Sequence, residues 1–321
     1  MKYWFGLLLF SIAAPVAAAP KADDIAAYKA LGALDLRLAT IGYRLVTANA
    51  PFCTMTRPDP GWVLHDIAQY PDEEVARAAF AFSGPVAIAA LVPNGAAERA
   101  GLQAGDGIMG IDSRTWEFDG SKLRKPDYRR MELVKSLFDD AIANSKHLVV
   151  RYERGGRKDQ LLLEPVTACR SDFTVDPAAG RDAGADGDRV RVTSGMIDYT
   201  ADDNELAAVV AHELSHNLLD HRAKLAVVKK GKIAAIRATE EEADRLSVWL
   251  MANAGYDPQA AIRFWQRYGK ATGLGILSAP THYRWKTRVH MLGEEIAAIS
   301  LVTPKKGIRP PPLLKTAVSP K

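Results

Sequence analysis

One short stretch constrains the fold of this chain more than any other: His212-Glu213-Leu214-Ser215-His216. On an α-helix, residues four positions apart lie on one face, so both imidazoles can reach one metal ion. Glu213 lies at the edge of that face, where its carboxylate can take a proton from a water on the metal. Catalytic zinc usually takes three protein ligands and leaves a fourth position for water. The chain must therefore form a helix here and bring a third ligand to it from elsewhere.

The flanking residues predict that this helix is buried. Asp202 is a good N-cap, and Glu205, three positions later, completes a capping box. Apolar residues then recur at helical spacing: Leu206, Val209, Val210, Leu214 and Leu218. A helix with two incidental histidines is the alternative, because a motif with three fixed positions recurs by chance. The buried context and the acidic motif that follows favour the metal site.

The acidic motif is Glu240–Asp244, with the sequence EEEAD. Thr239 is predicted to cap a helix here, and Glu242 completes its capping box, which gives Glu242 a structural role. Glu240 and Asp244 lie four positions apart, on one face of that helix. The helix dipole alone also favours acidic residues in a first turn. After H-E-x-x-H, however, a ligand role for one glutamate is the better hypothesis.

Two runs carry a family resemblance: Asn204–His221 (NELAAVVAHELSHNLLDH) and Glu240–Arg245 (EEEADR). Together they resemble the HtpX and CAAX-prenyl-protease family of zinc endopeptidases, most of all its soluble periplasmic branch of the BepA and LoiP kind. The resemblance implies an α+β fold with a mainly helical, zincin-type metalloprotease domain and a small β-sheet. It also implies a gluzincin-type endopeptidase that cleaves cell-envelope proteins, such as misfolded ones, in quality control.

The same resemblance assigns roles to individual residues. One Zn²⁺ per chain would be held by His212, His216 and Glu240. Glu213 would be the general base, and Asp244 would orient a metal ligand.

A late motif of the family, T-H-P-x-x-x-x-R, has a counterpart in this chain. Thr281, His282 and Arg288 match it, while Tyr283 stands where the family has proline. The resemblance places His282 and Arg288 along the active site, where they are candidates for stabilising the tetrahedral oxyanion.

The first residues have the pattern of a signal peptide. Lys2 precedes an apolar run, Trp4–Ala14, and Ala17–Ala19 forms an A-x-A-like cleavage site. The run is shorter than the roughly 20 residues that a transmembrane helix needs. We therefore expect a periplasmic or secreted protein with no transmembrane span after cleavage. An uncleaved N-terminal membrane anchor is the alternative.

The chain has two cysteines, Cys53 and Cys169, which lie far apart in sequence. In an exported protein an even pair favours a disulfide bond. Such a bond would join the two ends of the segment between them. Two buried free thiols are the alternative.

The bracketed segment has its own signature. Val86–Val92 alternates as a strand does, and the pattern V-x-P-x-G-x-A-x-x-A-G-L-x-x-G-D-x-I resembles a PDZ domain. The resemblance implies a peptide ligand added as a strand beside a helix, predicted here over Asp127–Ala143. The carboxylate-binding loop is expected within Arg77–Phe82, which lacks the usual glycines. A β-rich interaction domain without its own ligand is the alternative.

Three segments near the metal motif carry further expectations. Arg189–Asp198 is predicted to be a strand that leads to the metal-binding helix, and Val192–Gly195 could pair with an extended substrate. Asp172–Gly187 is rich in Asp, Gly and Ala, which predicts a loop. Ala223–Arg237 is basic and fits either a mobile flap over the cleft or a solvated helix and loop.

The length of 321 residues suits two modules. The predicted map has five parts: signal peptide 1–19, N-terminal helical part of the protease domain 20–74, PDZ domain 75–168, zinc metalloprotease domain 169–304 and disordered tail 305–321. The formal net charge of +4 gives no argument for nucleic acid as a partner.

Two classes of function remain at this stage. The leading hypothesis is a zinc metalloendopeptidase with protein or peptide substrates and a PDZ module for substrate binding or regulation. The alternative is a latent protease that acts mainly as a chaperone-like or scaffold protein for clients. In that case His282 would occupy the fourth position on the metal and exclude water.

Overall fold

The computed structural model describes residues 22–115, 129–142, 147–271 and 284–314. The fold is α+β, as predicted. Its helices are α1 Ala22–Asn49, α2 Glu73–Phe80, α3 Ala96–Arg99, α4 Arg129–Ile142, α5 Ser194–Tyr199, α6 Asp203–Leu218, α7 His221–Ala226, α8 Lys232–Asn253, α9 Gln259–Ala271 and α10 Trp285–Leu301. Its strands are β1 Thr56–Asp59, β2 Trp62–Asp66, β3 Val86–Leu91, β4 Gly107–Ile111, β5 Arg114–Thr115, β6 Leu148–Arg154, β7 Arg157–Leu163, β8 Val166–Cys169, β9 Asp172–Asp176, β10 Ala183–Ala185 and β11 Arg189–Thr193. The predicted signal peptide lies outside the described residues.

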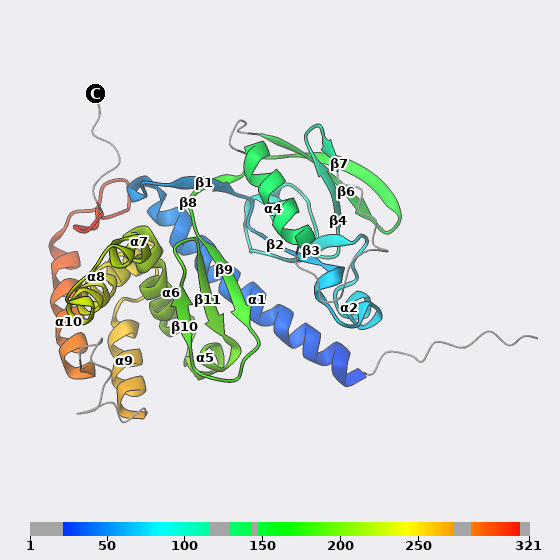
Figure 1. The fold of residues 1–321 in the computed structure, drawn as a ribbon. Helices are drawn as coiled ribbons and strands as arrows, with labels where there is room; N and C mark the ends of the chain where they lie inside the picture. The colour runs from blue at the N-terminus through cyan, green and yellow to red at the C-terminus, as the bar shows by residue number, and fades with distance from the viewer. Residues whose placement is uncertain (1–21, 116–128, 143–146, 272–283, 315–321) are drawn as a thin grey trace, which may run out of the picture.

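One part of the molecule is a β-rich unit inserted between the two cysteines (Figure 1). Its antiparallel sheet has the order β2-β3-β4-β6-β7, with β5 paired to β4. Helix α4 packs on this sheet through Phe138, whose ring centroid lies 5.1 Å from that of Trp62 on β2. Val134 belongs to the same buried core as Ile88 on β3. The sheet includes β2, so this unit begins earlier than the boundary predicted at residue 75. The PDZ likeness of the unit stays a prediction.

One expectation for this unit is wrong. The segment that was expected to hold a carboxylate-binding loop is mostly helical, because α2 continues through Phe80. Asp72 caps the start of α2 by accepting from the backbone N–H groups of Glu74 and Val75. Ala81 ends it in the left-handed conformation.

The other part is mainly helical and surrounds α6. This helix is buried nearly all round, because every residue from Glu205 to His212 is buried. It packs against α8, α9 and α1 and against the three-stranded sheet β10-β11-β9 (Figure 1). The predicted N-cap is confirmed, because the side chain of Asp202 accepts from the backbone N–H of Glu205.

The sheet beside α6 differs from the prediction. Strand β11 lies in its middle, paired antiparallel with β10 and parallel with β9. Val192–Gly195 therefore cannot offer a free edge to a substrate, since the ladder on both sides of β11 is occupied. The expected loop 172–187 instead supplies both β9 and β10. Strand β10 is an edge of this sheet, on the side where α6 lies.

The helix that carries the acidic motif starts earlier than predicted. Helix α8 begins at Lys232, so Thr239 lies within it and is not its N-cap. The residue before α8, Gly231, adopts a left-handed conformation and provides no side-chain cap, which left no sequence signal for the start. Much of the basic segment 223–237 is therefore helical, in α7 and α8.

The tail prediction is wrong for residues 305–314. Lys305 and Ile308 form a β-bridge, and Leu314 is 8% exposed against the helical core. Residues 315–321 lie outside the described part of the chain.

The predicted disulfide bond between Cys53 and Cys169 is present. It lies beside the antiparallel pair β1 and β8, in which Thr56 is opposite Cys169. The chain thus enters and leaves the inserted unit through a two-stranded stem closed by a covalent bond. Within the described ranges, no helix combines the length and apolar character that crossing a membrane requires.

Candidate metal centre

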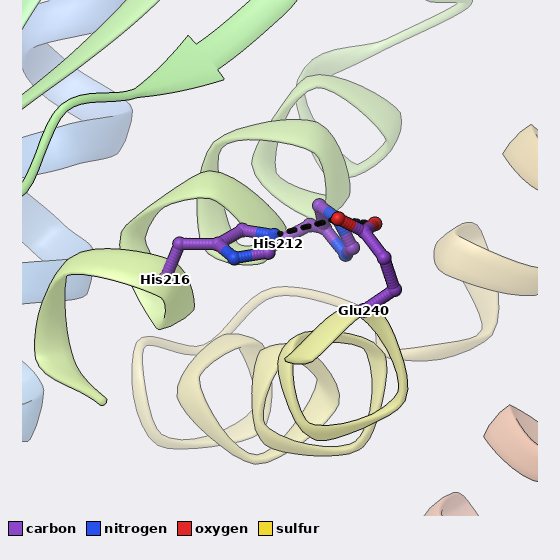
Figure 2. Close-up of side chains that lie close together, drawn as sticks. All are labelled: His212, His216 and Glu240. Atoms are coloured by element: carbon purple, nitrogen blue, oxygen red, sulfur yellow. Dashed lines mark hydrogen bonds and ion pairs between the residues drawn. The ribbon is translucent and has the colours of Figure 1, made fainter. Parts of the chain in front are cut away.

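Helices α6 and α8 bring the three predicted metal ligands together. His212 and His216 project from one face of α6 toward Glu240 on α8, as Figure 2 shows. Among the described residues, these three are the set whose ligand atoms all lie within 4.8 Å of one another. The spacing of four positions in α6 and the packing of α6 on α8 create this arrangement.

The distances fit a small tetrahedral cation. The Nε2 atoms of His212 and His216 are 3.3 Å apart. The Glu240 carboxylate oxygens lie 3.3 Å from Nε2 of His212 and 3.6 Å from Nε2 of His216. Ligand atoms at ~2.0–2.2 Å from a tetrahedral zinc ion lie about 3.3–3.6 Å from one another. The nitrogen and oxygen donors and their spacing therefore suit zinc.

Behind the first histidine stands a buried ion pair. Asp244 Oδ1 lies 3.0 Å from Nδ1 of His212. Arg288, from α10, donates to the same carboxylate through Nε at 2.6 Å and a terminal nitrogen at 2.5 Å. The guanidinium also stacks on the ring of Trp265, 3.3 Å from its centroid. The carboxylate thus fixes the ring of His212, and Arg288 fixes the carboxylate.

The electrostatics of the two histidines differ. Burial alone would lower the pKa of His212, but its hydrogen bonds to Asp244 and Glu240 outweigh burial and raise that pKa to about 10. Burial and the neighbouring charge of His212 lower the pKa of His216 to about 3. The centre therefore combines one strongly basic imidazole with one that stays neutral.

Glu213 lies against the same centre. Burial raises the pKa of its carboxyl group, partly opposed by the nearby charge of His212. The residue borders a cavity of about 470 Å³ that His216 and Glu240 also line. The cavity is bounded by β10 through Ala185 and by α8 through Ile236. The raised pKa makes this carboxylate a stronger base than an exposed glutamate, and the cavity beside it gives a water access to it.

Of the remaining predicted site residues, the structure describes Arg288 but not Thr281, His282 and Tyr283. Arg288 is 5% exposed and pairs with Asp244 behind His212. Its predicted role toward an oxyanion stays a prediction. Thr281, His282 and Tyr283 fall in 272–283, outside the described residues, so the predictions for them stay open.

One residue at the centre, His221, was missed by the sequence analysis, and so was its contact with Glu242. Nδ1 of His221 lies 2.8 Å from Nδ1 of His216, and its Nε2 lies 2.9 Å from Glu242. The only sequence signal was a histidine shortly after the motif.

A pair of histidines and a glutamate on packed helices, with a buried carboxylate beside them, is the arrangement of a metallopeptidase centre. A sequence profile described as peptidase family M48 matches residues 178–236, which contain the H-E-x-x-H motif. This match, together with the two relatives described next, supports a metallopeptidase of the M48 kind.

Two curated relatives are similar to part of the chain. The beta-barrel assembly-enhancing protease of Yersinia pestis is 27% identical over 25% of this chain and 24% of its own length. The mitochondrial metalloendopeptidase OMA1 of Schizosaccharomyces pombe is 28% identical over 34% of this chain and 41% of its own. The match thus spans about a quarter of the length of the first relative and about two fifths of the length of the second.

Among solved structures, the PDZ domain of HtrA3 bound to a phage-derived ligand matches 35% of this chain and 88% of its own. The TM-score is 0.25 and the sequence identity 18%. A likeness at that score adds nothing to the assignment of the inserted unit.

Proposed function

We propose that this protein is a zinc-dependent metalloendopeptidase that cleaves unfolded or damaged proteins of the cell envelope. One observation carries the proposal: His212, His216 and Glu240 converge at tetrahedral spacing beside Glu213 and a cavity. The match to the M48 profile supports the reaction class, and both relatives are named as proteases.

Each residue of the centre has a task in peptide hydrolysis. His212, His216 and Glu240 would hold the ion, which when bound supplies a Lewis acid for the scissile carbonyl and the attacking water. Glu213 takes the proton of that water and passes it to the leaving amine, a transfer that its raised pKa favours. Asp244 keeps the ring of His212 in the orientation that presents Nε2.

An extended substrate can pair with strand β10. Thr193 donates to the carbonyl of Asp182, and Asp186 donates to the carbonyl of Arg189. In an antiparallel pair the bonding direction alternates along the strand. The backbone groups of Ala183 and Ala185 therefore point away from β11, toward the free edge. Because Ala185 also borders the cavity beside Glu213, a peptide added here would run past the proposed base.

The proposal extends to compartment and to the inserted unit. The disulfide bond between Cys53 and Cys169 suits an oxidising compartment, and the N-terminal pattern suits export, so we place the protein in the periplasm or outside the cell. The inserted unit would act as a PDZ module that binds peptides or regulates cleavage.

Metal removal tests the proposal. The purified full-length protein should cleave an unfolded model protein, lose that activity after chelation and regain it with zinc. Glu240→Gln should bind zinc more weakly, because a neutral amide replaces the anionic ligand. Cleavage that survives complete chelation would contradict the proposal, as would wild-type zinc affinity in Glu240→Gln.

A further inference from the structure

The histidine that directly follows the break after α6 has contacts that the proposed catalytic set does not explain. His221 is 1% exposed, although histidine can remain at a protein surface. Its ring meets that of His216 edge-on, with centroids 4.9 Å apart. Its two nitrogens contact His216 and Glu242, at 2.8 and 2.9 Å. We infer that His221, held by Glu242, is a positioning residue that fixes His216 for metal binding; the inference rests on the proposed zinc site.

The tautomers follow from the direction in which His216 faces. Its Nε2 faces Glu240, so a metal there uses the Nε2 lone pair and leaves the ring proton on Nδ1. That Nδ1–H can only donate, so Nδ1 of His221 accepts. His221 then carries its own proton on Nε2 and donates it to Glu242. Both hydrogen bonds, from His216 to His221 and from His221 to Glu242, then have one donor and one acceptor. The Glu242 carboxylate thus selects the tautomer of His221.

The backbone is shaped to place this ring. On a continuous helix, a residue five positions after His216 lies about 140° around the axis and could not meet its ring. Helix α6 ends at Leu218, and Asp220 adopts φ 53° and ψ 42°, in the left-handed region. This reversal starts α7 at His221 and returns the imidazole to the metal-binding face. Aspartate is one of the few residues that enter this conformation readily.

The two metal-binding histidines are therefore held differently. His212 has a carboxylate directly on Nδ1, and that carboxylate is neutralised by Arg288. His216 has a neutral imidazole on Nδ1, with the Glu242 carboxylate one ring further away. Lys224 also approaches Glu242, at 3.4 Å. Outer partners of this kind fix the orientation of the ligand ring.

The test measures zinc affinity rather than cleavage alone. Zinc dissociation constants are measured by competition with a chromophoric chelator, on the full-length disulfide-bonded protein. His221→Leu should weaken zinc binding about 10- to 100-fold. His221→Asn should recover most of the loss, because its side-chain oxygen can accept near the position of Nδ1. His290→Leu is the matched control, since His290 pairs with Glu294 on the exposed face of α10. This variant should leave the zinc dissociation constant unchanged.

A second measurement does not depend on any variant. In a long-range ¹H–¹⁵N spectrum of the zinc-bound wild-type protein, His216 should carry its proton on Nδ1 and His221 on Nε2. Wild-type zinc affinity in His221→Leu, or a proton on Nδ1 of His221, would overturn the inference alone. A wild-type protein that binds no zinc would overturn the proposed function as well.

Discussion

Asp244 is the buried carboxylate that contacts both His212 and Arg288 at the centre. Burial alone would raise its pKa, but Arg288 and His212 outweigh burial and lower that pKa to about 2. The carboxylate therefore stays ionised, although its side chain is only 2% exposed. An ion pair this deeply buried stabilises a fold only while both partners remain, because a lone buried charge is costly.

Removing this charge should affect both stability and metal binding. Asp244→Asn leaves the guanidinium of Arg288 buried without an anion, so we expect the free energy of unfolding to fall by ~3–5 kcal/mol. Zinc affinity should also fall, since His212 loses its partner. Asp203→Asn is the control, because its pair with Arg37 is exposed and worth ~0–1 kcal/mol. The free energy of unfolding is measured by denaturant unfolding. Equal decreases for Asp244→Asn and Asp203→Asn would contradict the role of Asp244 as the partner of a buried charge.

At the scale of single elements, α6 could be predicted almost completely and its surroundings only partly. The N-cap at Asp202, the apolar spacing and the His212–His216 interval are all local, so the sequence carries them. The position of His221 depends on the left-handed backbone conformation of Asp220. An aspartate can adopt that conformation but does not impose it, so the sequence alone does not predict it. The edge position of β10 depends on which strands pair, and short Ala-Gly segments carry little pairing information.

Strand β10 offers a direct test of substrate pairing. Ala185→Pro removes an outward backbone N–H without removing a bond to β11, so we expect kcat/KM for an unfolded protein to fall while zinc affinity is unchanged. Gly184→Ala is the control, because its added methyl group meets only Arg191, at 3.9 Å. Equal kcat/KM values for Ala185→Pro and the wild type would show that substrates do not use this edge.

Helix α1 meets β2 and β9 at a titratable contact. Asp35 lies 3.5 Å from His65 and accepts from the backbone of Val175. Burial raises the pKa of Asp35 from 3.8 to about 7, so the folded state favours the protonated carboxyl group. Its contribution to stability is complete below about pH 4 and is lost as the pH rises through about 7.

The variant Asp35→Asn should remove this pH dependence. Relative to Asp35→Asn, the wild-type free energy of unfolding should decline between about pH 4 and pH 7, as measured by urea unfolding at several pH values. Asp24→Asn is the control, since Asp24 is exposed near the start of the same helix. If the free energies of unfolding of Asp35→Asn and the wild type differ by the same amount across this pH range, Asp35 does not titrate in the folded protein as described.

At the scale of the whole molecule, α1 joins two units of different construction. It contacts α6 and α8 in the helical unit and α2 and β3 in the inserted unit (Figure 1). The disulfide bond between Cys53 and Cys169 closes a separation of 116 residues at the stem of the insertion. Lys135 on α4 also pairs with Asp172 on β9, so the inserted unit contacts the sheet that borders the metal centre. Substrate bound by the inserted unit would therefore be held by a body fixed to the metal centre.

The central claim is that Glu213 acts as the base at a zinc centre, and one measurement tests it most directly. Cleavage of an unfolded model protein is compared for the wild type and Glu213→Gln, each with its bound zinc quantified. We predict that Glu213→Gln binds one zinc per chain as the wild type does and loses cleavage by about 100- to 10,000-fold in kcat. Full cleavage by zinc-loaded Glu213→Gln would contradict the account.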